Sequence, residues 1–339
     1  MLSKLPSGRR GSLAAILLIY VGLLVFTYLN SPDLGNFGIT VLSGLFQGML
    51  LFLVAAGLSI VFGLMDVLNL AQGAYFMIGA YVAYDTQHPS GWIDVTAVVP
   101  DPNVRFILSL FLGLAVGAGL GFILERVFLR PLYTRPIFQL VLTFGVSLIL
   151  VELVQIIWNT TPYSWTEMFG VRENFFVLFG QRFSTYRLFV VGFGFVLIIA
   201  IGLLLKRTRL GIIIRAGVED REMVQSLGIN VRAVFTLVFT LGCAIAALGG
   251  AVAAPFLGAS PSLANTSLLT AIAAVVLGGM GSYLGTAVAS LMVGLSIAVA
   301  QDAAIGTSFA ALPSMTPLLL LILVLLVRPS GFFGSSRSN

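Results

Sequence analysis

The feature that most constrains the fold of this chain is a series of long apolar runs. A helix needs about 20 consecutive apolar residues to cross the core of a bilayer. Ten runs approach that length, at 13–30, 38–63, 67–84, 104–124, 137–158, 187–205, 233–257, 267–280, 284–301 and 314–327. Two of them are short, and two neighbouring pairs can each be read as one span plus a re-entrant piece. The sequence therefore predicts an all-α integral membrane protein, a polytopic helical bundle of about ten (8–10) transmembrane helices with broken or re-entrant segments.

Composition leaves little room for any other class of protein. Of the 339 residues, 58% are hydrophobic and only 9% are charged, whereas soluble domains carry about 25% charged residues. Such a chain cannot cover a globular surface with side chains that water solvates well. A soluble enzyme, a nucleic-acid-binding protein and a disordered tail are thereby excluded. No stretch between the runs is long enough for a separate soluble domain, so a single transmembrane domain is expected over 1–339.

The basic residues predict the orientation of the spans. Lys and Arg collect in cytoplasmic loops of membrane proteins. If the N-terminus is inside and ten spans alternate, fourteen of the 18 basic residues lie inside. We therefore expect both termini and the 206–232 loop in the cytoplasm. The sequence pI near 9.6 then reflects this anchoring and indicates no nucleic-acid partner.

Two of the apolar runs are interrupted in a way that indicates a function. Four glycines fall within residues 278–285, and a second interruption lies at 63–69. Glycine-rich sequence holds a straight helix poorly, and irregular backbone at membrane depth survives where protein or a water-filled cavity covers it. Broken helices in corresponding places point to a transporter-like core. Gly279, Gly281 and Ser282 in the glycine-rich break are therefore candidates for the substrate pathway.

The chain lacks the residues that several kinds of chemistry require. His88 is the single histidine and Cys243 the single cysteine, so no histidine-based metal site, no intrachain disulfide and no catalytic residues are expected. The only lysines, Lys4 and Lys206, do not follow glycine, whereas the phosphate-binding loop of ATPases needs Gly-Lys followed by Ser or Thr. We expect no bound cofactor and no ATP site in this chain. An energy source for transport would then lie outside it.

A few polar side chains inside the spans are candidates for contact with a solute. Asn69, Gln72 and Gly73 would share one face of a helix; the alternative is a clamp of hydrogen bonds between helices. Glu152 is the one charged residue well inside a span, and Gln155 shares its side of the helix. Its carboxylate either lines an outer vestibule that attracts an ammonium group or has a structural role.

Other polar and small residues follow helical spacing in patterns that favour packing. Gly113, Gly117 and Gly121 recur every four residues, a spacing that lets helix backbones approach closely in lipid. Two stripes of polar residues also lie on single helix faces and are more often packing than pathway: Gln139, Thr143 and Ser147, and Thr40, Ser43 and Gln47.

Several motifs together resemble one known family. Gly57–Gly73 is followed by Met77–Tyr81, the loop reads Arg215-Ala216 with Asp220 and Gly228-Ile229-Asn230, and Gly278–Ser282 precedes a closing Val327–Gly334. In this order, from about residue 40 to 334, they resemble the LivH-like permeases of branched-chain amino-acid ABC transporters.

The resemblance implies a division of labour among subunits in a bacterial plasma membrane. A second homologous permease would pair with this chain among membrane lipids, two cytoplasmic ATPase subunits would use ATP, and an extracytoplasmic solute-binding protein would deliver the solute. The 206–232 loop would dock on an ATPase through Arg215, Ala216, Asp220, Gly228, Ile229 and Asn230. The alternative for this amphipathic loop is a position on the lipid surface.

The resemblance leaves the solute open. Family members often carry His-Gly-Glu near the first break, where this chain has Gln72-Gly73-Ala74. The implied function is the import of a small polar or zwitterionic solute, most simply a branched-chain amino acid. Urea or a short amide is an alternative solute within the wider family. A self-sufficient carrier or channel and a non-transporting scaffold are the other function classes.

Overall fold

A computed structural model describes residues 21–22, 24–25, 28, 34–89, 95–167, 169–178, 180–209, 211–213, 216, 221–226, 228–304, 311–328 and 331–333. The chain forms two compact units, each assembled from separate stretches of sequence. Unit 1 comprises Met1–Phe52, Val171–Phe195 and Ile272–Asn339, and unit 2 comprises Leu53–Gly170 and Val196–Ala271. The expectation of one transmembrane domain stays a prediction.

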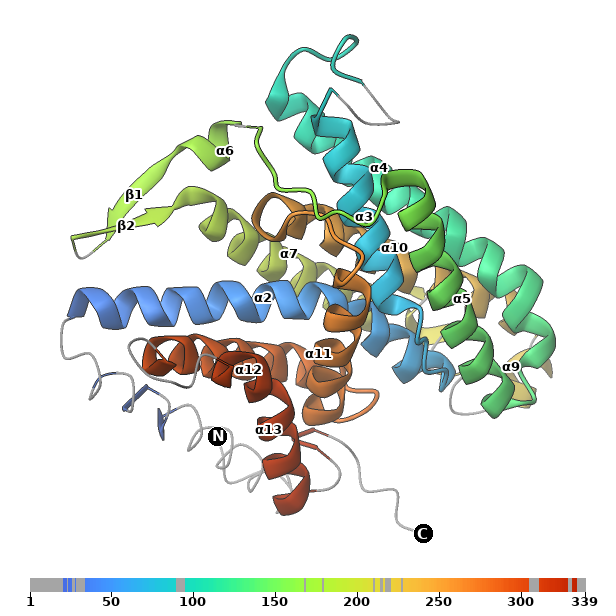
Figure 1. Cartoon of the computed structure of the whole chain (residues 1–339). Helices are drawn as coiled ribbons and strands as arrows, with labels where there is room; N and C mark the ends of the chain where they lie inside the picture. Colours follow the sequence, from blue (N-terminus) through green and yellow to red (C-terminus); the bar gives the residue numbers. More distant parts are fainter. Residues whose placement is uncertain are drawn as a thin grey trace. The chain divides into compact units, whose positions relative to one another are not determined.

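Helices dominate the described part of the chain (Figure 1). The long ones are α2 (Leu34–Met65), α3 (Gln72–Gln87), α4 (Pro102–Ile123), α5 (Pro136–Trp158), α7 (Thr185–Arg207), α10 (Val231–Leu257), α11 (Leu263–Gly278), α12 (Tyr283–Ala304) and α13 (Leu312–Val327). Every expected span from 38–63 onward coincides with one of these helices, whereas 13–30 lies almost entirely outside the described residues. Six helices of that part are long and apolar enough to cross a membrane, and two shorter ones are apolar. The predicted fold class is confirmed, with the number of spans approximate.

Capping residues explain where two of the long helices begin. Asp101 precedes α4, and its side chain accepts a hydrogen bond of 2.9 Å from the amide of Asn103. Asn230 precedes α10 and accepts from the amide of Ala233 at 3.1 Å. Asp and Asn are strongly preferred at this position because their oxygens satisfy amides that the helix leaves unpaired.

The core of unit 2 is built where α4 packs on α10. A side-chain carbon added at Gly117 would lie 2.4 Å from Cβ of Ala247, and one at Gly121 would lie 2.6 Å from Cβ of Cys243. Gly113 meets Ala251 in the same register. The glycine spacing therefore works as predicted, since it allows α4 to approach small residues of α10 in steps of one turn.

Helix α3 is enclosed by protein rather than exposed along one side. Nearly all of its residues are buried, from Gln72 to Gln87, and it contacts α4, α5 and α10 (Figure 1). Its position explains why α3 has only 16 residues, because a helix covered by other helices need not match the thickness of lipid.

Unit 1 contains α12 and α13, which pack on each other, and part of α2. Gln47 on α2 donates a hydrogen bond of 2.7 Å to the side-chain oxygen of Gln301 on α12, and Ser43 accepts from Arg187 at 3.5 Å. Thr40 is buried and bonds to the backbone oxygen of Asn36. These bonds support packing as the role of this polar stripe.

A β-hairpin in unit 1 was not expected from the sequence. Strands β1 (Phe175–Leu178) and β2 (Gln181–Ser184) pair antiparallel after the short helix α6 (Gly170–Glu173). Phe176 lies opposite Phe183, with ring centroids 5.5 Å apart. Gly180 takes a φ of 80° in the turn, a conformation that glycine adopts without strain.

Candidate functional site

The first helix break, between α2 and α3, is held by buried polar side chains of unit 2. Asn69 lies before the start of α3, so the helical-face argument does not apply to it. The turn nevertheless brings its side chain to Gln72, because Asn69 Nδ2 donates to Gln72 Oε1 at 3.0 Å. Asn69 Oδ1 also accepts from the amide of Ala71 at 3.1 Å. Both side chains are fully buried.

Gln72 connects this break to α10. Its Nε2 donates to the carbonyl oxygen of Gly242 at 2.9 Å. A side-chain carbon added at Gly57 would lie 2.1 Å from Gln72 Nε2 and 2.3 Å from that same oxygen, so glycine at 57 leaves room for the bond. A side-chain carbon added at Gly73 would lie 1.9 Å from the backbone oxygen of Ala264, so only glycine fits there. These contacts favour the clamp interpretation of Asn69, Gln72 and Gly73.

The polar stripe of α5 supports the same break. Thr143 Oγ1 accepts a hydrogen bond of 3.2 Å from the amide of Leu70, which no helix satisfies. Gln139 donates to the backbone oxygen of Leu132 at 2.7 Å, and Ser147 is buried on the same face. This stripe packs against the break, as its spacing predicted.

The second break, between α11 and α12, lies in unit 1. Gly279 and Gly281 have φ values of 95° and 86°, which side chains other than glycine rarely adopt. Ser282 caps α12, because its Oγ accepts from the amide of Gly285 at 3.1 Å. Gly279, Gly281 and Ser282 are the pathway candidates of this break. The structure gives each of them a role in the backbone: the glycines allow the positive φ values, and the serine caps α12.

The end of the chain closes over this second break. The amide of Phe332 donates to the carbonyl oxygen of Leu277 at 2.9 Å, and the amide of Phe333 donates to that of Gly278 at 3.0 Å. These two oxygens belong to the last turn of α11, which leaves them without partners inside the helix. Phe332 is buried, and Gly331 takes a φ of 70°. The closing motif therefore serves as a cap for α11.

Comparison with known proteins identifies the family. Residues 40–327 match the family described as the permease component of the branched-chain amino acid transport system. The chain belongs to this family. The chain is also similar to the high-affinity branched-chain amino acid transport system permease protein LivH of Escherichia coli strain K12, to which it is 29% identical over 304 residues, 86% of this chain and 94% of that protein.

Other permeases of this type are similarly related. The permease protein BraD of Pseudomonas aeruginosa is 29% identical over 315 residues, 89% of this chain and 97% of BraD. A probable LivH from Methanocaldococcus jannaschii is 27% identical over 296 residues, 84% of this chain and 89% of that protein. No solved structure matches the chain. The membership agrees with the resemblance predicted from the motifs and establishes a multi-pass membrane permease.

Within this permease, Glu152 lies on the exposed side of α5. The buried face of that helix is formed by Gln139, Thr143, Ser147, Leu150 and Val154, and Glu152 is exposed. Nine residues separate Glu152 from Thr143, which is about 180° around a helix of 3.6 residues per turn. Gln155 is half-buried at the border of the exposed face. The acid is therefore separated from the polar network of the first break.

Only part of the 206–232 loop of the permease falls within the described residues. Arg215 and Asp220 lie outside them, and Ala216 is half-buried. Helix α9 (Arg221–Ser226) contacts α10, and it buries Val224 and exposes Met223. Gly228 then turns the chain with a φ of 80°, and its amide donates to the backbone oxygen of Gln225 at 3.0 Å. Ile229 follows and precedes Asn230, the residue that caps α10. The described part of the loop thus ends in a tight glycine turn before α10.

The structure also reveals a buried acid that sequence reasoning missed. Helix α4 continues into a π-helix, η2 (Leu124–Leu129), and a 3-10 turn, η3 (Arg130–Leu132). Glu125 on η2 is fully buried and accepts a short hydrogen bond from the hydroxyl of Tyr133. Its other oxygen has no hydrogen-bond partner among the described residues. Because Glu125 follows directly on the apolar run 104–124, the sequence alone places it in a loop.

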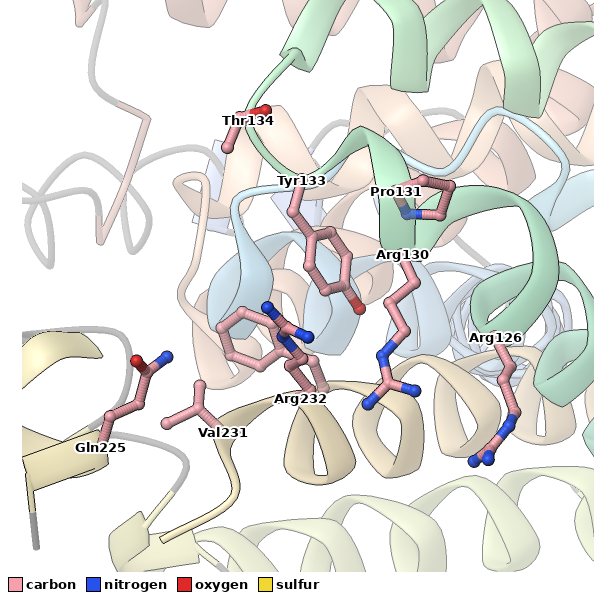
Figure 2. A pocket seen from close by; sticks show the side chains of 9 residues that line it. Arg126, Arg130, Pro131, Tyr133, Thr134, Gln225, Val231 and Arg232 are labelled. Atoms are coloured by element: carbon pink, nitrogen blue, oxygen red, sulfur yellow. The ribbon is translucent and has the colours of Figure 1, made fainter. Parts of the chain in front are cut away.

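Two cavities of unit 2 meet beside this π-helix. One, of about 560 Å³, is lined by Arg126, Arg130, Tyr133, Arg232 and their neighbours. Figure 2 shows Arg126 and Arg130 extending from the η2–η3 segment toward α10, which carries Arg232. The other cavity, of about 700 Å³, shares Arg126 and Arg130 but is otherwise mostly apolar. No cluster that could hold a metal ion occurs among the described residues.

Proposed function

We propose that this permease is a subunit of an ABC importer that moves branched-chain amino acids into the cytoplasm. The proposal rests on the similarity to relatives that match 84–89% of the chain and whose names state branched-chain amino acid transport. The absence of a Gly-Lys phosphate loop in the sequence supports separate ATPase subunits as the energy source. A second permease and an extracytoplasmic solute-binding protein complete the proposed importer.

The proposed orientation places both termini and the 206–232 loop in the cytoplasm of a bacterial cell. Fourteen basic residues would lie on that side of the plasma membrane. Cys243, the only cysteine, is fully buried, so a Cys243→Ala chain is a simple background for labelling. Ser226→Cys and Val98→Cys provide exposed probes that would lie on opposite sides of the membrane in this orientation. We expect a membrane-impermeant maleimide added to intact cells to label position 98 alone. Labelling of position 226 alone would show that the orientation is the opposite of the one proposed.

The proposed function is tested by uptake into proteoliposomes. The chain, its partner permease and the ATPases are reconstituted with the binding protein outside and ATP inside the vesicles. We expect ATP-dependent uptake of leucine, isoleucine or valine, and none by the chain alone. Uptake of urea or acetamide instead would assign the alternative solute, and uptake by the chain without ATPases would identify a self-sufficient carrier.

A further inference from the structure

Unit 2 contains an apolar groove that ends in arginines, and neither the transport of a solute nor the packing of the unit accounts for it. The groove is the cavity of about 700 Å³ between α4, α7 and α10. Its walls are mostly apolar: Leu114, Ala118, Phe122, Leu204, Leu237 and Leu241. Arg126, Arg130 and Asn230 lie at one end. The groove therefore has an apolar body and a cationic end.

The dimensions of the groove are those of a lipid chain rather than of a protein side chain. Leu114 and Arg126 are twelve residues apart along α4 and η2, which is about 18 Å at 1.5 Å per residue. On α10, Asn230 and Ala244 bound a wall of about 21 Å by the same measure. A fatty-acyl chain fills such a length, whereas an acidic side chain of a partner protein reaches only the arginines.

The charged end is suited to a phosphate group. The cavity of about 560 Å³ adds Arg232, Tyr133 and Thr134 to Arg126 and Arg130 (Figure 2). Within the described residues, none of the three arginines forms an ion pair with an acid, since the one salt bridge there joins Arg105 to Glu167. Arg130 Nε is buried and has no hydrogen-bond partner there. One buried carboxylate lies nearby, that of Glu125, which accepts a hydrogen bond from Tyr133. The three arginines outnumber it, so the local charge is positive.

We infer that this groove binds one anionic phospholipid, with an acyl chain along the groove that α4, α7 and α10 line and the phosphate among Arg126, Arg130 and Arg232. Basic pockets between transmembrane helices at the cytoplasmic face suit anionic headgroups in this way. The hydroxyl of Thr240, a buried oxygen without a partner among the described residues, lines the groove and can donate to an ester oxygen. Only the choice of leaflet rests on the proposed orientation; binding itself does not depend on the solute.

The test measures lipid bound to the purified full-length chain by native mass spectrometry after exchange into detergent. The probes are phosphatidylglycerol, phosphatidylethanolamine and inorganic phosphate. We expect one phosphatidylglycerol to remain, in clear preference to phosphatidylethanolamine, and phosphate alone not to bind. Since each basic residue contributes a factor of about five to headgroup attraction, Arg126→Gln with Arg130→Gln lowers the affinity by about 25-fold.

Matched variants separate a lipid held in this groove from lipid or phosphate bound elsewhere on the chain. Arg126→Lys with Arg130→Lys keeps the charge and retains binding, and Arg135→Gln removes an arginine that lines neither cavity and changes little. Ala118→Phe fills the groove, leaves every arginine in place and lowers phosphatidylglycerol binding, provided that the variant elutes as a single species. Equal retention of both lipids, phosphate binding that Ala118→Phe does not affect, or undiminished phosphatidylglycerol binding after Arg126→Gln with Arg130→Gln would each overturn the inference. None of these readouts requires transport, so they stand apart from the uptake experiment.

Discussion

The side-chain amide of Gln72 donates a hydrogen bond of 2.9 Å to the backbone carbonyl oxygen of Gly242. This bond joins the first turn of α3 to the middle of α10 inside unit 2. Gln72 also accepts from Asn69, so one side chain holds both the break and the helix after it. These bonds support a structural role for the side chains of Asn69 and Gln72 in holding the break against α10.

Replacing Gln72 by leucine should destabilise the permease without changing its affinity for solute. The carbonyl of Gly242 and the amide of Asn69 would lose a buried partner, which costs about 1–3 kcal/mol. We expect a lower Tm of the purified chain and an unchanged KM of the reconstituted importer. Gln155→Leu is the control, because that side chain lies at the border of the exposed face of α5. A raised KM at normal Tm would instead assign Gln72 to the solute pathway.

A bulky residue on the glycine face of α4 should prevent folding of unit 2. A side-chain carbon added at Gly117 would lie 2.4 Å from Cβ of Ala247, whereas one added at Gly119 would have nothing within 4 Å. Gly117→Leu should therefore force α4 away from α10, while Gly119→Leu is tolerated. The measurement is the yield of monodisperse protein in detergent, and equal yields of the two variants would contradict the packing described for α4 and α10.

The C-terminal segment caps α11, so replacing Gly331 in that segment by alanine should lower the Tm of the protein strongly. Gly331 and Gly180 both have positive φ, at 70° and 80°, so alanine adds about 1–2 kcal/mol of backbone strain at each. Only at Gly331 does the added carbon meet the backbone, 2.5 Å from the oxygen of Val276. Gly331→Ala should therefore lower Tm more than Gly180→Ala. The prediction fails if the two variants unfold at the same temperature.

The turn at Gly228 should be required for coupling to an ATPase. Proline fixes φ near −65°, whereas Gly228 has a φ of 80°, and its amide bonds to Gln225. Gly228→Pro should therefore displace α9 and abolish solute-stimulated ATP hydrolysis while the spans still insert. Gly228→Ala, which keeps the amide, should have a milder effect. Wild-type ATP hydrolysis and uptake by Gly228→Pro would remove the 206–232 loop from the coupling mechanism.

Hydrophobic runs predicted the described helices well because most of the runs are long and are bounded by polar residues or glycines. Gly113, Gly117 and Gly121 also predicted their packing face, since the spacing has one steric consequence. The conformation of the first break was beyond reach, because the hydrogen bond of Gln72 depends on Gly242, far away in the sequence. The π-helix that buries Glu125 has no simple sequence signature, and the alternating residues of the hairpin at 175–184 are too few to stand out.

The side of α5 on which Glu152 lies was, in contrast, readable from the sequence. All faces of this helix are rich in apolar residues, so apolarity alone does not separate lipid from protein. The stripe of Gln139, Thr143 and Ser147 marks the buried face, and a residue nine positions after Thr143 points the opposite way. Taken together, the two observations place Glu152 on the surface of this chain.

Glu152 should face the second permease or the pathway between the two permeases. It lies roughly 7 Å from the middle of α5 along the helix axis, where a charged side chain facing lipid costs about 2.5–3.5 kcal/mol on insertion scales. Pairing with a second permease would remove this cost. If the carboxylate attracts the ammonium group of the solute, Glu152→Gln should raise KM for amino acids in a normally assembled importer. Gln155→Ala serves as the neighbouring control, and a Glu152→Gln importer with wild-type kinetics would leave the carboxylate a structural role only.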